Sequence, residues 1–260
     1  MEKVMFAEER QKKIVLLLRS KKQVLVNELC EMFSVSAATI RTDLTILEQQ
    51  GYLQRTHGGA ILLHSASYEM TTDEKESLHI DEKINIGECA ASLIKDGDTV
   101  ILDSGTTTMC LAEFLGDKKD VTVVTNDIKI AAYLEHFDNI STFIIGGKTR
   151  KGHYCSVGSF ANNMINSLKV DKAFISANAV DDSFVLSTPD SEQAEVKKSM
   201  MKAAKTKVFL CDSSKFNNYS LVGFASLKDF DVIITDAKIY PELFEQIEAL
   251  GKRIIRAKGE

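Results

Sequence analysis

The residues with the clearest chemistry lie in polar loops that each follow a short apolar segment. The apolar segments end near Leu102, Val124, Ile145 and Leu210. The loop residues that we expect to bind a ligand are Asp103, Ser104, Gly105, Thr106, Thr107, Thr125, Asn126, Gly147, Arg150 and Lys215. Hydroxyl groups and fixed positive charges suit a phosphate, whereas carboxylate and amide groups suit sugar hydroxyls. The combination predicts a phosphorylated sugar or polyol as the ligand.

The loop after Leu102 is the best candidate for the phosphate end of that ligand. Gly105 has no side chain, so backbone amides can approach an anion, and a predicted helix begins directly behind it. Taken singly, the Asp-Ser-Gly sequence also fits an ordinary helix-initiating turn, Gly-Gly a tight bend, and Lys215 a solvated lysine. Four such loops together favour a binding site.

These loops can meet only if strands and helices alternate in one sheet. We expect strands at 99–102, 121–124, 142–145, 172–176, 207–210 and 232–235, and helices at 73–95, 107–115, 127–134, 191–204 and 241–250. Short apolar strands between helices are typical of a mostly parallel sheet covered on both faces. Ligands bind outside the carboxyl ends of such strands, where all four loops emerge. The larger part of the chain is therefore predicted to be an α/β domain.

A second group of candidate residues lies on a predicted helix from about Ser36 to Gln50. Ser36 is a good N-cap, and Ile40, Leu44 and Leu47 form one apolar stripe. Short polar side chains and one arginine near the start of the helix fall off this stripe. The N-terminal end of a helix favours phosphate, and it is the end that a recognition helix presents to DNA.

The neighbouring segments fit a winged helix-turn-helix. Apolar periodicity predicts one helix around residues 14–18 and another from Val26, which ends three residues before the recognition helix begins. Beyond Gly51, residues 52–56 alternate and a Gly-Gly turn leads into residues 60–63. A short antiparallel hairpin is therefore expected beside the helices.

The residues that we expect to contact DNA are Ser36, Thr39, Arg41, Thr42, Arg55 and His57. Arg41 and Thr42 are expected to face the groove, and the other four to lie near phosphate. His57 fits equally well as a residue of the wing turn that makes no contact.

The motif residues of this region are Val35-Ser36, Thr39-Ile40-Arg41, Asp43-Leu44, Leu47-Glu48, Gly51, Leu53, Arg55 and His57-Gly58-Gly59-Ala60. In this pattern, residues 6–62 resemble the N-terminal module of the DeoR family of bacterial transcriptional regulators. The helix pattern alone also fits a three-helix bundle with a hairpin and no DNA role, but the resemblance favours a regulator. The family commonly has a second basic residue where Thr42 stands, so one phosphate contact is expected to differ.

The motifs of the remaining chain are Asp103-Ser104-Gly105-Thr106-Thr107, Thr125-Asn126, Gly146-Gly147 with Arg150, Gly158, and Asp212-x-Ser214-Lys215-Phe216. They resemble the C-terminal sensor domain of the same family, which is similar in fold to sugar-phosphate isomerases of the ribose-5-phosphate type. Residues 177–185 depart from the family pattern, which usually has glycines where Ala179 and Val185 stand. We therefore expect the loop on that side of the pocket to differ.

Composition is that of a soluble globular protein: 44% of the 260 residues are hydrophobic and 27% are charged. The first residues are acidic where a signal peptide needs bases, and no apolar run reaches membrane-spanning length. We therefore expect a cytoplasmic protein with no membrane partner.

Five scattered cysteines without C-x-x-C spacing indicate neither a disulfide framework nor a zinc site. No metal and no cofactor are expected.

The net charge of −5 is unevenly divided along the chain. Residues 1–60 hold nine basic and seven acidic residues, whereas the remainder holds 23 basic and 30 acidic residues. This division suggests phosphate affinity at the N-terminal end and an acidic bulk that reduces nonspecific adhesion. A balanced solvated surface explains the small excess of basic residues equally well.

Residues 63–72 lack periodicity and are rich in small polar residues, which indicates a linker. We expect a winged helix-turn-helix domain at 1–62, with the helix-turn-helix at about 23–42 and the wing at 52–63, and a sensor domain at 73–260. The resemblance implies a DNA-binding transcriptional regulator, a repressor of a carbohydrate or polyol operon that a phosphorylated metabolite controls. Paired operator half-sites on double-stranded DNA imply a homo-oligomer, either a dimer or a tetramer.

A sugar-phosphate isomerase with an appended DNA-binding module is the alternative. Asp103 and Lys215 are reactive residue types in a plausible pocket, but no motif identifies a general base. Sensor domains often keep the binding groups of an enzyme and lose its chemistry. We therefore expect no catalytic residue and no enzymatic activity.

Overall fold

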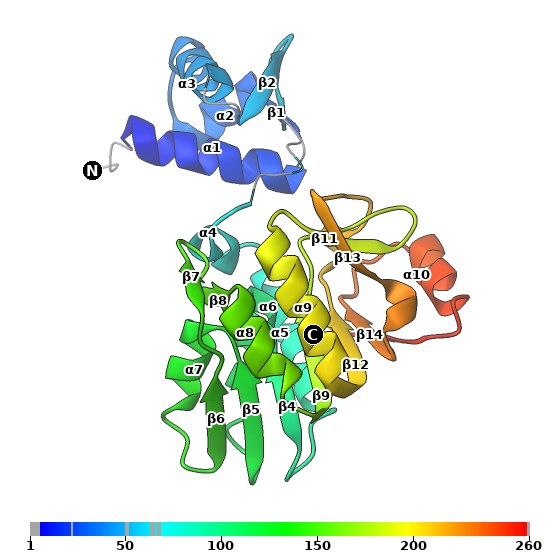
Figure 1. Ribbon diagram of the computed structural model, residues 1–260. Coiled ribbons are helices and arrows are strands. Elements are labelled where there is room, and N and C mark those ends of the chain that lie inside the picture. Colours follow the sequence, from blue (N-terminus) through cyan, green and yellow to red (C-terminus); the bar gives the residue numbers. More distant parts are fainter. Residues whose placement is uncertain (1–5, 22, 50–51, 63–65, 67–68, 259–260) are drawn as a thin grey trace. The chain divides into compact units, whose positions relative to one another are not determined.

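The computed structural model describes residues 6–21, 23–49, 52–62, 66 and 69–258 of the chain (Figure 1). The chain divides into two compact units, Met1–Ser65 and Ala66–Glu260. The division falls inside the predicted linker, of which residues 63–65 and 67–68 lie outside the described residues. Ala66 and Glu69 of the predicted linker already make hydrogen bonds within the second unit, so this unit begins earlier than the expected boundary at residue 73.

The first unit is a winged helix-turn-helix, as the sequence predicts. Its elements are α1 (Ala7–Lys21), β1 (Gln23–Leu25), α2 (Val26–Phe33), α3 (Ala37–Gln49), β2 (Leu53–Thr56) and β3 (Gly59–Leu62). The two wing strands pair antiparallel with each other, and β3 also pairs antiparallel with β1. The sequence did not indicate β1, because three residues are too few to show alternation. The predicted helix stop at Gly51 lies outside the described residues.

A buried ion pair joins α1 to α3 inside the first unit. The Nε atom of Arg10 lies 2.6 Å from Oδ2 of Asp43, and the Nε2 of Gln11 donates to Oδ1 at 2.8 Å. Apolar side chains from all three helices and the wing form the core of the unit, among them Ile14, Ile40 and Leu53. Asp43 therefore fixes the recognition helix to the rest of the unit.

The second unit is an α/β domain. Its elements are α4 (Thr72–Glu76), α5 (Ile80–Ala91), β4 (Thr99–Leu102), α6 (Thr106–Glu113), β5 (Val121–Thr125), α7 (Ile128–Leu134), β6 (Ile140–Ile144), β7 (Lys148–Arg150), β8 (Cys155–Val157), α8 (Ser159–Asn166), β9 (Val170–Ser176), β10 (Ala179–Val180), β11 (Val185–Thr188), α9 (Ser191–Ala203), β12 (Ala204–Leu210), η1 (Ser213–Lys215), β13 (Val222–Ser226), η2 (Leu227–Asp229), β14 (Val232–Thr235), α10 (Pro241–Glu248) and β15 (Arg253–Arg256). The fold class predicted from the sequence is confirmed.

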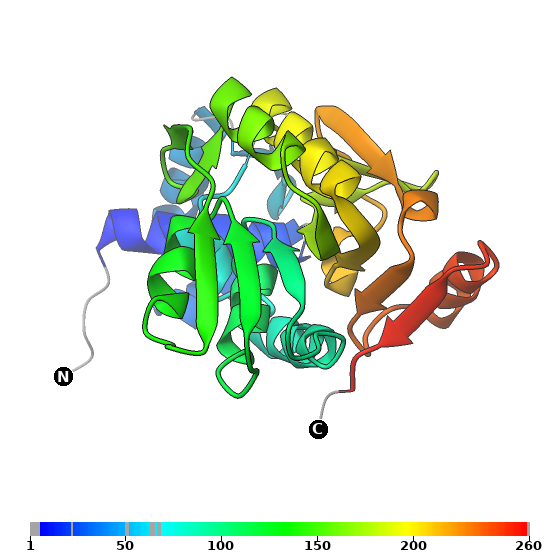
Figure 2. The same cartoon turned by 60° about the horizontal axis from the view of Figure 1, so that its bottom comes forward.

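Seven of these strands form a central sheet in the order β15-β14-β12-β9-β4-β5-β6, and every neighbouring pair is parallel. Successive side chains of a strand point to opposite faces, so Val100 and Leu102 join one apolar core and Ile101 joins the other. Helices α5, α6 and α7 supply the first core, whereas α8, α9 and α10 supply the second. Figure 2 shows α8 and α9 together on one side of the sheet.

The prediction of one continuous helix over residues 73–95 is wrong. The structure has α4 at Thr72–Glu76 and α5 at Ile80–Ala91, and between them His79 adopts a left-handed backbone conformation with φ of 53°. A left-handed residue ends the helical hydrogen-bond pattern, so the chain changes direction here. Thr71 and Glu74 form a capping box that starts α4 independently.

Several short elements were not predicted. They include the β7–β8 hairpin, helix α8 and an antiparallel sheet of β10, β11 and β13. The altered segment 177–185 contributes β10 and the start of β11 to that sheet. The strands among these elements have two to five residues and α8 has eight, so each is too short for a clear pattern in the sequence.

Candidate DNA-binding surface and ligand site

The start of α3 has the geometry expected of a recognition helix. Ser36 caps the helix, because its Oγ accepts a hydrogen bond from the amide of Thr39 at 3.2 Å. Arg41 and Thr42 are exposed one turn later. The hydroxyl of Thr42 donates to the carbonyl of Ala38 at 3.0 Å, so this hydroxyl is partly used within the helix. Arg41 is therefore the stronger candidate for a base contact.

The wing holds Arg55 against the recognition helix. The amide of Arg55 donates to Oε1 of Glu48 at 2.8 Å, its Nε lies 3.5 Å from Oε2, and its guanidinium donates to the hydroxyl of Thr45. Arg55 thus lies beside α3, and the carboxylate of Glu48 partly neutralises its positive charge. His57 is exposed in the wing turn, as expected for either of its two predicted roles.

A glycine in the wing turn is required by close packing. A Cβ atom on Gly59 would lie only 2.1 Å from the carbonyl oxygen of Val24 on β1. The adjacent Gly58 has open space around it but a φ of 92°. This position therefore favours glycine because of its backbone conformation and not because a side chain would clash. The two glycines therefore set the turn for different reasons.

A cavity of about 80 Å³ lies at the carboxyl edge of the central sheet. Five predicted ligand residues line it, namely Ser104, Gly105, Thr106, Thr107 and Lys215. Gly105 has a φ of 153°, and a Cβ atom there would lie 3.2 Å from the hydroxyl of Ser176. The loop from β4 to α6 thus brings hydroxyls and free helix amides to one wall of the cavity, as predicted.

Asp103 has a different position from the one expected. Asp103 is buried and does not line the cavity. Its Oδ2 atom accepts hydrogen bonds from the amide and the hydroxyl of Ser176, each at 3.0 Å. The same carboxylate forms an ion pair with Lys197. Lys197 does line the cavity. Asp103 therefore positions a cationic side chain rather than reaching a ligand itself.

Four other predicted ligand residues also lie outside the cavity lining. Thr125 accepts a hydrogen bond from the amide of Asp127 at 3.0 Å, and the side chain of Asn126 donates to the carbonyl of Ser156 at 2.8 Å. Gly147 is packed so closely that a Cβ atom would lie 2.7 Å from the carbonyl oxygen of Val157. These three residues hold the connections after β5 and β6. The fourth, Arg150, is bound by Glu69, Gln193 and Asp190.

Sequence reasoning missed most of the positive charge at the cavity. Besides Lys215, the ammonium-bearing side chains in its lining are Lys75, Lys83 and Lys197. Lys197 lies on α9 between Ala194 and Met201, and a lysine within an apolar stripe was the available signal. Lys83 is also buried, at the start of α5. These residues come from helices distant in sequence from the four loops.

Burial lowers the pKa of two of these lysines, Lys83 and Lys75. Burial, together with the positive charge of Lys215, lowers the pKa of Lys83 to about 8. Burial also lowers the pKa of Lys75, and attraction to Glu69 opposes that change. Closely placed ammonium groups in a confined site gain stability when an anion binds among them. The site is therefore suited to a phosphate or another compact anion, which would share these lysines with the carboxylates of Glu69, Asp103 and Asp212.

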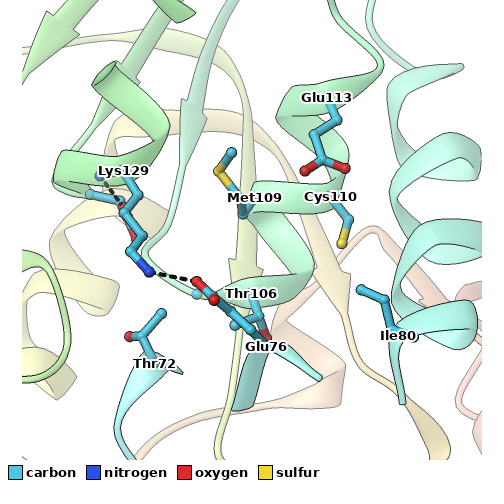
Figure 3. A pocket seen from close by; sticks show the side chains of 10 residues that line it. Thr72, Glu76, Ile80, Thr106, Met109, Cys110, Glu113 and Lys129 are labelled. Atoms are coloured by element: carbon cyan, nitrogen blue, oxygen red, sulfur yellow. Dashed lines mark hydrogen bonds and ion pairs between the residues drawn. The ribbon is translucent and has the colours of Figure 1, made fainter. Parts of the chain in front are cut away.

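A larger cavity of about 340 Å³ adjoins the first, and Gly105 and Thr106 line both. Figure 3 shows Met109, Cys110 and Glu113 of α6 along one wall and Lys129 pointing toward Glu76. The ammonium of Lys129 lies 2.5 Å from Oε1 of Glu76. The wall of apolar and acidic groups makes this second cavity unsuited to an anion.

No group of three or more histidine, cysteine, aspartate or glutamate residues in the described parts of the chain could hold a metal ion. Among the described helices, none is both long and apolar enough to cross a membrane.

Comparison with known proteins covers both units. The family description "DeoR-like helix-turn-helix domain" matches residues 10–66, and "DeoR C terminal sensor domain" matches residues 78–237. The transcriptional regulator FruR of Bacillus subtilis is 35% identical over 90% of this chain and 93% of its own. The lactose phosphotransferase system repressor of Lactococcus lactis is 36% identical over 91% of this chain and 94% of its own.

Among solved structures, ribose 5-phosphate isomerase A of Neisseria gonorrhoeae matches 57% of this chain and 56% of its own, with 18% identity and a TM-score of 0.39. A likeness of this size supports no conclusion about activity.

Proposed function

Because the chain belongs to the DeoR family of transcriptional regulators, and is a DNA-binding regulator rather than an enzyme, we propose that a phosphorylated sugar or polyol bound in the 80 Å³ cavity controls its repression of a carbohydrate operon. The isomerase alternative lacks support, since the relatives are named as regulators and repressors. The lactose phosphotransferase system repressor and the putative aga operon repressor of Escherichia coli suggest the kind of operon.

The observation that carries this proposal is the meeting of four lysines with a hydroxyl-rich loop around one cavity. Ser104, Thr106 and Thr107 can donate hydrogen bonds, and the first turn of α6 adds backbone amides that have no carbonyl partner within the helix. Lys197 and Lys215 supply charge from two other elements. A phosphoryl group has the charge and the acceptor oxygens that use these donors together.

On the DNA side, we propose that Arg41 enters the major groove and that Ser36, Thr39 and Thr42 lie at the same end of α3. The N-terminus of a recognition helix is where base and phosphate contacts concentrate. Arg55 and His57 would flank this end from the wing. We also propose a cytoplasmic homo-oligomer, because operator half-sites are read by paired recognition helices.

A gel-shift experiment tests the proposal. The full-length protein is bound to the region upstream of its neighbouring operon and titrated with a panel of sugar phosphates, with the unphosphorylated sugars as controls. One phosphorylated compound should shift the binding curve, and its parent sugar should not. Lys215→Ala should still bind DNA but lose the response. A response that persists in Lys215→Ala would refute the placement of the ligand in this cavity.

A further inference from the structure

One wall of the anion cavity is formed by a segment near the start of the second unit. We call residues 69–78 the cover segment; Glu69, Met70, Lys75 and Leu78 within it line the cavity. The segment is held at Thr72, whose amide donates to the carbonyl of Gly152 at 2.8 Å. It contains the short helix α4 and ends before the left-handed residue His79. The cover segment is thus a separate piece of chain between the unit boundary and α5.

The carboxylate of Glu69 occupies a site made of anion-binding groups. Its Oε1 accepts from the ammonium of Lys75 at 2.7 Å and from the side-chain amide of Asn178 at 2.8 Å. Its Oε2 accepts from the guanidinium of Arg150 at 2.9 Å. The Glu69 side chain is only 6% exposed. A buried carboxylate is stable here only because three donors compensate its lost hydration.

The same donors also face the cavity. Lys75 and Asn178 line it, as does Gln193, to which Arg150 donates a hydrogen bond. A phosphoryl group in the cavity therefore meets donors that Glu69 already uses. Pockets for small organic ligands have volumes of roughly 300–1,000 Å³. At about 80 Å³, the cavity is smaller than that while the cover segment stays in place.

We propose that Glu69 is a built-in competitor for the effector: the phosphoryl group of the effector displaces its carboxylate from Lys75 and Asn178, which releases the Glu69 end of the cover segment, residues 69–71, while Lys75 stays on the phosphoryl group. This inference rests on the proposed function of the cavity. It adds that binding must remove a contact that the empty protein makes. A phosphate carries more charge than a carboxylate and offers more acceptor oxygens, so it can replace Glu69 at these donors. Arg150 keeps a second carboxylate partner, Asp190, at 3.4 Å.

Displacement of Glu69 gives the ligand a way to act on the rest of the chain. Glu69 follows the boundary between the two units by only four residues. A ligand shifts an equilibrium only when it binds two states unequally, and a contact that must break on binding creates such an inequality. The released segment is covalently continuous with the chain that leaves the DNA-binding unit.

Two measurements on the full-length protein test this inference, with inorganic phosphate as the probe. The first is calorimetric titration of the wild type, Glu69→Gln and Glu76→Gln. Glu76 is the matched control, because it is a carboxylate of the same segment that lines the other cavity and pairs with Lys129. Glu69→Gln should bind phosphate about tenfold more tightly, which is about 1.4 kcal/mol, and Glu76→Gln should match the wild type. Unchanged or weaker binding by Glu69→Gln would overturn the inference.

The second measurement separates displacement from simple removal of a charge. Hydrogen exchange should become faster in residues 69–71 of the wild type when phosphate binds. Unchanged or slower exchange in residues 69–71 would mean that Glu69 stays in place when the anion binds, which contradicts the inference. The proposed function has its own outcome: if Lys215→Ala binds phosphate as the wild type does, the cavity is not the anion site. If Lys215→Ala loses binding while Glu69→Gln gains none, only the role of Glu69 is refuted.

Discussion

Arg10 and Asp43 form a buried ion pair across 33 residues of sequence, with 2.6 Å between Nε and Oδ2. Their side chains are 8% and 3% exposed. Asp43 belongs to the motif that resembles DNA-binding regulators, yet it points into the unit rather than toward a groove. Its role is to hold α3 against α1, so its loss should affect folding first and DNA binding as a consequence.

Asp43→Ala should lower the free energy of unfolding of the first unit by about 3–5 kcal/mol, because it leaves a guanidinium buried without its carboxylate. Chemical denaturation monitored by circular dichroism measures this change. The exposed pair of Lys13 and Glu9 on α1 is the matched control. Lys13→Ala should cost only about 0–1 kcal/mol. Equal losses in the two variants would show that the buried pair contributes no special stability.

Arg41→Ala should weaken operator binding by about 1–3 kcal/mol if the guanidinium reads a base edge. The side chain is exposed, so thermal stability should not change. Fluorescence anisotropy with labelled operator measures the affinity, and nonspecific DNA serves as the comparison. A similar loss on both DNAs would assign Arg41 to phosphate contact alone; an unchanged affinity would remove it from the interface.

Gly59→Ala should disrupt the wing more than Gly58→Ala. The added Cβ at Gly59 would meet a backbone carbonyl at 2.1 Å, so strand β1 or β3 must move. At Gly58 the cost is conformational strain at positive φ, of about 1–3 kcal/mol. Denaturation curves for both variants give the comparison. A Gly59→Ala protein as stable as Gly58→Ala would contradict the close contact between β1 and β3.

Anion binding should weaken as the pH rises above about 8, where Lys83 loses its proton. The pKa of Lys83 is lowered in the folded state, so the folded protein binds fewer protons than the unfolded chain between about 8 and the ordinary value of 10.5. Over that window stability should rise with pH while anion affinity falls. Lys83→Arg keeps the charge and should remove the fall in affinity.

Titration with sulfate, whose charge is constant in this range, measures the affinity of both proteins at each pH. Parallel pH profiles for the wild type and Lys83→Arg would mean that another group causes the change.

The sequence predicted those elements whose pattern is local and continuous. Strand β14 at Val232–Thr235 has the expected bounds, because a short apolar run followed by a polar loop identifies a buried strand. The start of α3 was also expected, since Ser36 caps the helix just before its apolar stripe. The break at His79 was not, because nothing in its residue type demands a left-handed conformation.

The binding site was predicted only where its residues are consecutive in the sequence. The loop at Ser104–Thr107 carries its chemistry in consecutive residues, so its pattern is visible in the sequence. Lys83 and Lys197 each lie on a helix among apolar residues, and only tertiary packing brings them to the cavity. Thr125 and Asn126 have suitable side chains, but the Thr125 hydroxyl and the Asn126 amide nitrogen already bond to backbone groups, and neither residue lines the cavity.

The cavity is built almost entirely from residues that the two apolar cores do not use. Of its described lining residues, Ala177 alone packs against either core. Substitutions at the partly exposed positions of the lining can therefore leave both cores intact, whereas Lys197, which is buried against Asp103, also belongs to the framework of the fold. A duplicated copy of such a protein can diverge toward a new metabolite by changing a few loop and helix positions while it inherits the same scaffold.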